Sequence, residues 1–138
     1  MQIGSHSKTH PNFFNLSLKE KMLELTDSKA ILEKIIGKEV STFSFPFGLY
    51  DDECADTVFS AGYSFCCTSK HGISSGLSFM VPRNSINAHM SPSRIEKILR
   101  AGFSQRLRWF FEDNSKDVIK SLIGRERYIK LRDKILHE

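Results

Sequence analysis

Segments with the pattern of a strand and segments with the pattern of a helix follow one another along residues 1–102. Ser17-Leu18-Lys19-Glu20 has the sequence of a capping box, in which the serine hydroxyl accepts a hydrogen bond from the first helical turn and the glutamate reaches back. Thr42–Gly48 alternates polar and aromatic residues, as a strand does, and then breaks at Pro-Phe-Gly. This alternation predicts an α/β fold with parallel strands and helices outside, as an open sheet or a barrel.

Each expected element has its own start or stop signal. Apolar residues recur on one face of Leu18–Ile36, and Gly37 supplies a C-terminal stop. The remaining elements are expected to be a helix capped by Asp51 and running to about Ser60, strands over Tyr63–Thr68 and Phe79–Val81, and a helix from Ser91-Pro92 to Gly102. In folds of parallel strands, the chemistry lies on loops at the carboxyl ends of the strands.

Residues 103–138 differ from the rest of the chain in composition. They begin with aromatic residues among arginines, and we expect a helix after Asn114-Ser115 that continues through Ile135. Residues 100–138 contain ten Lys/Arg and six Asp/Glu, whereas residues 1–99 contain ten of each, so the net charge of +4 comes from the C-terminal part. We expect a basic, amphipathic helical tail that packs on a first domain of residues 1–102. Contact of this tail with nucleic acid or an anionic membrane surface is the alternative.

The composition is that of a folded protein, with 40% hydrophobic and 26% charged residues among 138. No apolar run approaches the roughly 20 residues that cross a bilayer. No charged-then-apolar signal opens the chain, and the compartment stays open between the cytoplasm and the cell envelope. The cysteines Cys54, Cys66 and Cys67 are odd in number and two are adjacent, so we expect buried thiols rather than a disulfide framework.

His6 and His10 are the strongest candidates for a functional site. Imidazole is the commonest neutral metal ligand, and two histidines four residues apart can reach one ion of the Zn²⁺ type. Ser7 stands where the helical H-E-x-x-H zinc motif needs its glutamate, and Gly4 and Pro11 disfavour a helix, so we expect a loop at the end of a strand. Catalytic sites normally take three protein ligands, so this pair requires another.

The order and spacing of three segments resemble the polysaccharide deacetylase family of carbohydrate esterases. The segments are Ile3–Pro11, the helix Leu18–Ile36 and Phe45–Asp51, and Val81-Pro82-Arg83 resembles a later strand of the family. The resemblance covers roughly residues 2–72. It implies a partial distorted (β/α) barrel with a C-terminal helical extension, and metal-dependent hydrolysis of N-acetyl groups on amino sugars of a polysaccharide or glycan.

The resemblance also implies roles for individual residues. His6 and His10 would bind a divalent metal, usually Zn²⁺, and the backbone N–H of Phe47 would stabilise the oxyanion. Residues that support the loops or the substrate would be Ser7, Pro46, Gly48 and Tyr50. A metal ion in such a site polarises the acetamide carbonyl and lowers the pKa of a bound water.

The chain departs from the family pattern at several positions. The family's Asp-Asp pair, which supplies a base and the third ligand, lies on a strand before the histidines, and this chain begins almost on the histidines. In many members an arginine stands two residues before the proline, and Ser44 occupies that position here. The late Leu-x-x-His motif, source of the general acid, is not recognisable, which leaves His89 and His71 as the candidates for the acid.

The departures leave the question of enzyme activity open. We expect the C-terminal part of a longer deacetylase domain, whose missing N-terminal segment would leave strand edges unpaired and favour self-association. Asp51-Asp52 is not a substitute for the acidic pair, because Asp51 is expected to cap a helix. A non-catalytic carbohydrate-binding module, or a structural remnant of the fold, is the second hypothesis. A nucleic-acid or membrane-surface binder ranks third, because the tail matches no nucleic-acid motif; we expect an N-acetylated glycan as partner.

Overall fold

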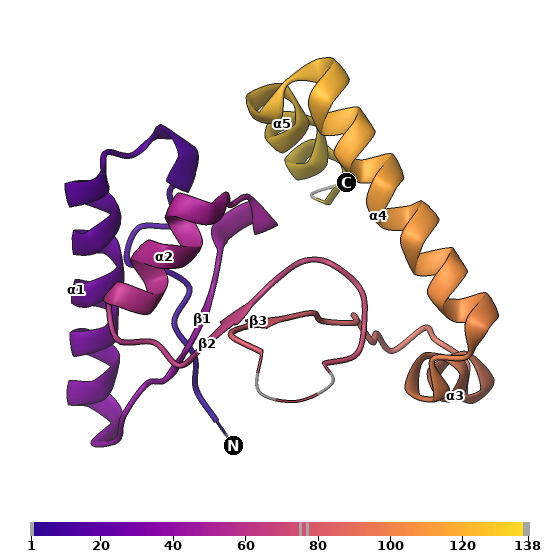
Figure 1. The fold of residues 1–138 in the computed structure, drawn as a ribbon, viewed down its shortest axis with the longest axis horizontal. Coiled ribbons are helices and arrows are strands. Elements are labelled where there is room, and N and C mark those ends of the chain that lie inside the picture. The colour runs from indigo at the N-terminus through magenta and orange to yellow at the C-terminus, as the bar shows by residue number, and fades with distance from the viewer. Residues whose placement is uncertain (1, 75, 77, 137–138) are drawn as a thin grey trace. The chain divides into compact units, whose positions relative to one another are not determined.

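The computed structural model describes residues 2–74, 76 and 78–136, and the backbone alone for residues 125 and 132–136. Helices and strands alternate along the chain (Figure 1), which confirms the α/β class. In chain order the elements are the 3-10 helix η1 (Phe13–Asn15), α1 (Leu18–Ile36), β1 (Thr42–Ser44), the 3-10 helix η2 (Pro46–Gly48), α2 (Asp52–Ser60), β2 (Phe65–Cys67), β3 (Met80–Val81), α3 (Pro92–Arg100), α4 (Phe103–Ile123) and α5 (Arg125–Leu136).

The contacts group the chain into two compact units. The first unit consists of Met1–Ser69 and Ser74–Arg83 and holds the strands together with α1 and α2. The second unit consists of Lys70–Ile73 and Asn84–Glu138 and holds α3, α4 and α5. The helix α3 therefore belongs with the C-terminal helices, while the predicted domain boundary at residue 102 stays a prediction.

The strands of the first unit form a parallel sheet in the order β1-β2-β3, in which Phe43 of β1 lies opposite Cys66 of β2. Ser5 extends this sheet by an isolated parallel bridge to Phe43. Its N–H donates to the Thr42 carbonyl at 2.8 Å, and its carbonyl accepts from the Ser44 N–H at 3.0 Å. Parallel neighbours in chain order are what the strand–helix alternation predicted. Closure of the sheet into a barrel stays a prediction.

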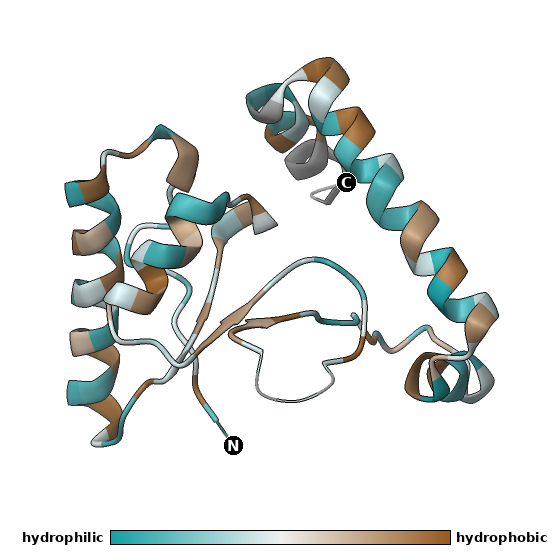
Figure 2. Ribbon diagram, in the orientation of Figure 1, coloured by the Kyte–Doolittle hydropathy of each residue, from teal (hydrophilic) through white to brown (hydrophobic). Residues whose placement is uncertain are grey.

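The core of the first unit lies between this sheet and the helices α1 and α2. Its buried residues are Phe13, Leu25, Val40, Phe43, Phe45, Cys54, Val58, Tyr63 and Cys66. Hydrophobic and hydrophilic residues are interleaved along α1 and α2 (Figure 2), so each helix can bury one side. The buried Lys21 of α1 forms a 2.6 Å ion pair with Glu53 of α2, which joins the two helices.

The ends of α1 and α2 confirm the predicted caps. The Ser17 hydroxyl accepts from the Glu20 N–H, and the Glu20 carboxylate accepts from the Ser17 N–H at 2.8 Å. Gly37 ends α1 in the left-handed conformation, with φ of 65°. Asp51 caps α2 by accepting the Cys54 N–H at 2.9 Å, which is the role expected for it.

The predicted start of the last helix was wrong. The helix α4 begins at Phe103 and runs through Asn114 and Ser115. The Ser115 hydroxyl donates to the Glu112 carbonyl at 2.9 Å, so its polar group is satisfied inside the helix instead of capping a new one. The break comes at Gly124, whose φ of 80° and ψ of 150° separate α4 from α5.

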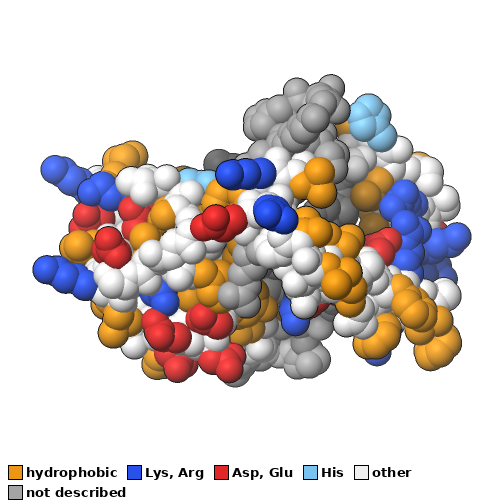
Figure 3. Space-filling model, turned by 90° about the horizontal axis from the view of Figure 1, so that it is seen from above, with side chains coloured by type: hydrophobic (Ala, Val, Ile, Leu, Met, Phe, Trp, Pro, Cys, Tyr) orange, Lys and Arg blue, Asp and Glu red, His pale blue; other side chains and the backbone are white. Residues whose placement is uncertain are grey.

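Many apolar side chains of α4 are exposed, among them Phe103 at 84% and Leu122 at 79%. In Figure 3, hydrophobic side chains lie at the surface beside Lys and Arg side chains on the side of α3 and α4. Trp109, on another face of α4, is buried with Ile98 and Ala101. Packing of residues 103–138 on the first unit stays a prediction. None of the helices in the described ranges has the length and apolar character needed to cross a membrane.

The cysteines are free thiols, as expected from their number. Cys54 and Cys66 are buried, and Cys67 is half-buried. Burial raises the pKa of Cys54 to about 11 and that of Cys66 to about 12. Both buried thiols are therefore neutral and unreactive near neutral pH.

Candidate functional site

The histidine loop, residues 5–11, leaves the sheet at the Ser5 bridge and returns over α1. The ring centroids of His6 and His10 lie 5.0 Å apart with an interplanar angle of 62°. Both side chains are exposed. The loop therefore brings the two imidazoles together at the carboxyl-terminal edge of the sheet.

A backbone carbonyl from β1 orients the His6 ring. His6 Nδ1 lies 2.6 Å from the carbonyl oxygen of Ser44. Because a carbonyl oxygen can only accept, Nδ1 carries the hydrogen, and in the neutral ring this leaves the lone pair on Nε2. Metal-binding histidines use the same arrangement, in which the second nitrogen donates to a carbonyl and thereby sets the tautomer.

The proline turn, residues 45–49, lies against the histidine loop. The Phe47 ring lies 4.6 Å from the His10 ring, centroid to centroid, at 67°. Phe47 and Gly48 both have left-handed backbone, with φ of 59° and 63°. A Cβ on Gly48 would overlap the side chain of Ser69, so only glycine fits there. Pro46 is buried beneath the turn.

Two further predicted residues have contacts within the protein. The Ser7 hydroxyl accepts the His10 N–H at 3.0 Å and so ties the two halves of the histidine loop together. The Tyr50 ring stacks on Phe45 at 5.1 Å and 14°, at the edge of the core. Contacts of Ser7 and Tyr50 with a carbohydrate stay predictions.

Sequence reasoning missed Glu24, which lies on α1 under the histidine loop. Its carboxylate accepts hydrogen bonds from the N–H groups of Lys8 and Thr9 and from the Thr9 hydroxyl. Burial opposes ionisation of this carboxyl, but these hydrogen bonds outweigh it and lower the pKa of Glu24. Asp27 and Ser28 on the same face of α1 also contact the loop, through the Lys8 ammonium and the Ser5 hydroxyl. The spacing of Glu24, Asp27 and Ser28 on one helix face was the available signal.

Arg83 was quoted only within a strand-like segment, and its side chain reaches the same edge of the sheet. Its Nη2 donates to the Ser44 hydroxyl at 2.8 Å, and its Nε donates to the Thr68 carbonyl at 3.0 Å. Ser44 is the position at which many family members were expected to have an arginine. The guanidinium of Arg83, which follows β3, therefore lies beside Ser44. No local sequence signal linked Arg83 to Ser44.

The residues at this edge fit part of a metal site. Two imidazoles are suitable ligands for a divalent ion. Within the described ranges, however, no group of three or more His, Cys, Asp or Glu residues is placed to hold a metal ion. Asp51 is occupied as the cap of α2. His6 and His10 can thus supply two ligands, and the described residues do not add a third.

The later histidines lie in the second unit. His89 is exposed in a turn, and its backbone N–H donates to the Asn87 side chain at 3.1 Å. The His71 N–H and Nδ1 both contact the Asp113 carboxylate, at 2.9 and 2.8 Å, and the ring stacks on Trp109. His71 thus has a packing role within its unit, and an acid role for His89 stays a prediction.

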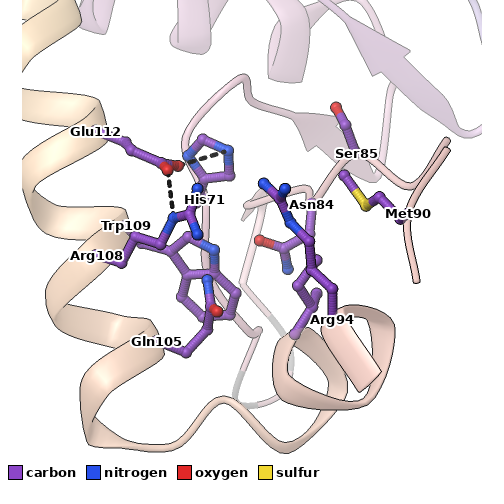
Figure 4. Close-up of a pocket in the computed structure, with 10 residues that line it drawn as sticks. His71, Asn84, Ser85, Met90, Arg94, Gln105, Arg108, Trp109 and Glu112 are labelled. Carbon is purple, nitrogen blue, oxygen red and sulfur yellow. Dashed lines mark hydrogen bonds and ion pairs between the residues drawn. The ribbon is translucent and has the colours of Figure 1, made fainter. Parts of the chain in front are cut away.

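A cavity of about 90 Å³ lies in the second unit (Figure 4). Glu112 on its wall pairs with Arg108 at 2.6 Å and lies 3.9 Å from Nε2 of His71. Ligand pockets usually begin at roughly 300 Å³. The cavity is therefore too small to be the site of a glycan, and its acidic group is already paired.

Comparison with known proteins connects the histidine loop and the proline turn to one family. The family model described as polysaccharide deacetylase matches residues 1–66. The peptidoglycan-N-acetylmuramic acid deacetylase PdaC of Bacillus subtilis (strain 168) is 36% identical over 52 residues, which are 38% of this chain and 11% of PdaC.

Solved structures of deacetylases are similar to the fold. The deacetylase PplD of Streptococcus pyogenes, in complex with acetate, has a TM-score of 0.63 and 26% identity, covering 69% of this chain and 43% of PplD. A polysaccharide deacetylase from Bacillus cereus has a TM-score of 0.63 and 28% identity, and the match covers 71% of this chain and 32% of the Bacillus cereus protein. The chain thus spans less than half the length of these relatives.

Proposed function

Because the chain belongs to the polysaccharide deacetylase family, we propose that it serves the metal-dependent removal of N-acetyl groups from amino sugars of a polysaccharide or glycan. The observation on which the proposal depends is the pairing of the His6 and His10 rings, 5.0 Å apart, beside the proline turn. By their names, the relatives PdaC and PplD are deacetylases, and PdaC acts on N-acetylmuramic acid of peptidoglycan.

In this proposal, each residue at the edge of the sheet has a defined task. His6, oriented by the Ser44 carbonyl, and His10 hold one divalent ion of the Zn²⁺ type. Such an ion supplies Lewis acidity toward the acetamide carbonyl and toward water. The Phe47 backbone N–H donates to the oxyanion that develops on the substrate, and the left-handed turn at Phe47 and Gly48 sets its direction.

The reaction also needs carboxylates that the described residues do not contribute at this edge. A third ligand and a general base are required, and the resemblance implies that the family's Asp-Asp pair, at the end of a strand that comes before the histidine motif, supplies both.

A non-catalytic carbohydrate-binding module is the second candidate function. The observation in its favour is that the described part of the chain lacks a group of three metal-ligating side chains. A chain with two ligands and no base could keep the fold and a glycan contact without turnover. It would then bind glycan with or without zinc.

Zinc titration of the 138-residue chain by calorimetry tests the proposal. We expect one Zn²⁺ per chain, and at least tenfold weaker binding in His6→Ala and in His10→Ala, because each variant removes a ligand. Asp52→Ala is the control, since Asp52 is an exposed carboxylate on α2. It should bind zinc as the wild type does.

Glycan assays then separate the two candidate functions. Acetate release from an N-acetylated oligosaccharide that requires zinc and is lost in His6→Ala supports deacetylation. Glycan binding without acetate release or zinc uptake supports the non-catalytic module. If the chain neither takes up zinc nor binds glycan, both candidate functions are contradicted.

A further inference from the structure

Glu24 holds the part of the histidine loop that lies between the two imidazoles. Its Oε2 accepts the N–H groups of Lys8 and Thr9 at 2.8 Å each, and its Oε1 accepts the Thr9 hydroxyl at 2.7 Å. Hydrogen bonds to an ionised carboxylate are shorter and stronger than those between neutral groups. One side chain on a rigid helix therefore binds two consecutive peptide groups of the loop.

The loop needs such an anchor because its backbone is strained. Ser7 and His10 have φ values of 69° and 59°, a left-handed conformation that residues with a Cβ adopt at a cost in free energy. Strained residues of this kind persist only where the surroundings impose the conformation. Lys8 and Thr9, the residues bound by Glu24, are the two residues between Ser7 and His10.

We propose that Glu24 is the positioning residue of the histidine pair. Its carboxylate fixes the Lys8–Thr9 segment, and thereby sets the separation and orientation of the His6 and His10 rings for one divalent ion. The inference rests on the proposed function for the binding of that ion, and on the hydrogen bonds of Glu24 for the placement of the loop. Glu24 acts through the loop, because both of its oxygens accept from loop donors.

Asp27 provides a matched comparison. It lies one turn further along α1 and contacts the same loop, through the Lys8 ammonium at 2.8 Å. Both side chains of this ion pair are more than 40% exposed, at 47% and 43%. Exposed pairs contribute little, and this one leaves the loop backbone unbound. Asp27 should therefore be nearly dispensable for the geometry of the histidines.

The test compares Glu24→Ala, Glu24→Asp, Glu24→Gln and Asp27→Asn in the 138-residue chain. Zinc affinity by calorimetry should fall by about 10- to 100-fold in Glu24→Ala and Glu24→Asp, as expected for the loss of a group that orients metal ligands. The aspartate variant keeps the charge but is one methylene too short. It serves as the second variant if the alanine variant does not fold.

Glu24→Gln should rescue most of the affinity. The amide oxygen can accept both N–H groups, and the amide nitrogen can donate to the Thr9 hydroxyl oxygen. Asp27→Asn should remain within twofold of the wild type. Wild-type affinity in folded Glu24→Ala and Glu24→Asp, or an equal loss in Asp27→Asn, would overturn the inference.

A second measurement keeps the inference separate from the proposed function. Nitrogen-15 NMR of the His6 ring without metal reports the fraction with hydrogen on Nδ1, which depends on the contact with the Ser44 carbonyl. Glu24→Asp should lower this fraction and Asp27→Asn should not. If the wild type takes up no zinc, the proposed metal dependence fails, and the tautomer alone decides the role of Glu24. An unchanged tautomer in Glu24→Asp would then refute it.

Discussion

At the scale of single residues, backbone conformation determines which side chain the proline turn tolerates. Phe47 and Gly48 are both left-handed, with φ of 59° and 63°. Phe47 adopts this conformation although it has a Cβ, and its ring packs against the His10 ring. Gly48 lies so close to the Ser69 side chain that a Cβ does not fit there. The strain at Phe47 thus lies at the site proposed for the oxyanion contact, as strained residues in proteins often do.

Gly48→Ala should destabilise the fold more than Gly37→Ala. Both glycines have positive φ, but a Cβ on Gly37 meets nothing within 4 Å, whereas a Cβ on Gly48 overlaps Ser69. The Gly37 variant should lose about 1–2 kcal/mol for the left-handed conformation alone. The Gly48 variant should lose more, because Ser69 must also move. Urea denaturation of both variants measures the difference, and equal losses would contradict the clash.

The conformation at Gly48 was only partly predictable. The Pro-Phe-Gly sequence indicated a turn after the strand, which is confirmed by η2. The clash with Ser69 could not be predicted, because it depends on β2 running parallel to β1 and bringing residue 69 alongside the turn.

At the scale of elements, α2 and β2 each bury a thiol against the same core. Cys54 of α2 and Cys66 of β2 are fully buried together with Phe43 and Val58. Desolvation disfavours the thiolate and raises both pKa values, to about 11 and about 12. The packing of these two elements is therefore coupled to pH on the alkaline side.

The free energy of unfolding should decrease as pH rises from 9 to 10.5. The pKa of a thiol is 9.0 in the unfolded chain, and in the folded protein it is about 11 for Cys54 and about 12 for Cys66. The stabilisation is therefore complete below pH 9 and declines above it, where the unfolded chain loses protons that the folded protein keeps. The hydrogen bond to Glu53 raises the pKa of Lys21 above the ordinary lysine value of 10.5, so Lys21 adds its own dependence on pH above that value. The pH range of the experiment therefore ends at 10.5. Urea denaturation across this range measures the slope.

Cysteine variants identify the source of that slope. Cys54→Ala combined with Cys66→Ala should flatten the dependence on pH between 9 and 10.5. The half-buried Cys67 is the control, and Cys67→Ala should retain most of the slope. A slope that survives in the double variant would assign the effect to other groups.

At the scale of the whole molecule, the two compact units have separate cores. The first has the core of Phe43, Phe45 and Tyr63, and the second has a small core around Ile98 and Trp109. The segment Lys70–Ile73 belongs to the second unit and is held there by Asp113. Each unit should therefore respond separately to a change in its own contacts.

Asp113→Ala should loosen the second unit alone. The change removes the acceptor of the His71 N–H and leaves that partner unsatisfied, at an expected cost of about 1–3 kcal/mol. Hydrogen–deuterium exchange should speed up in Lys70–Ile73 and in α4, and should not change in β1, β2 and β3. Asp117→Ala on the same helix is the control, because its pair with Lys120 is half exposed, at 52% for Asp117. Faster exchange in the sheet would show that the units are not separate.

From α1 to α3, the sequence by itself determined the order and type of the helices and strands, because the signals for them are local. The Ser17 capping box, Gly37 and the Asp51 cap each act within a few residues of their position, and the structure has them as predicted. The start of α4 was wrong because Asn114 and Ser115 are cap residues only when the surrounding chain does not continue the helix.

The tertiary structure alone decided how the histidines are held. His6 and Ser44 are 38 residues apart, Arg83 and Ser44 are 39 apart, and Glu24 and Lys8 are 16 apart. Contacts between such distant residues depend on strand register and on the face that α1 turns to the loop, which no local pattern specifies. The sequence motif identified the two imidazoles, and the packing of β1 and α1 supplied the groups that hold their loop, the Ser44 carbonyl and the Glu24 carboxylate.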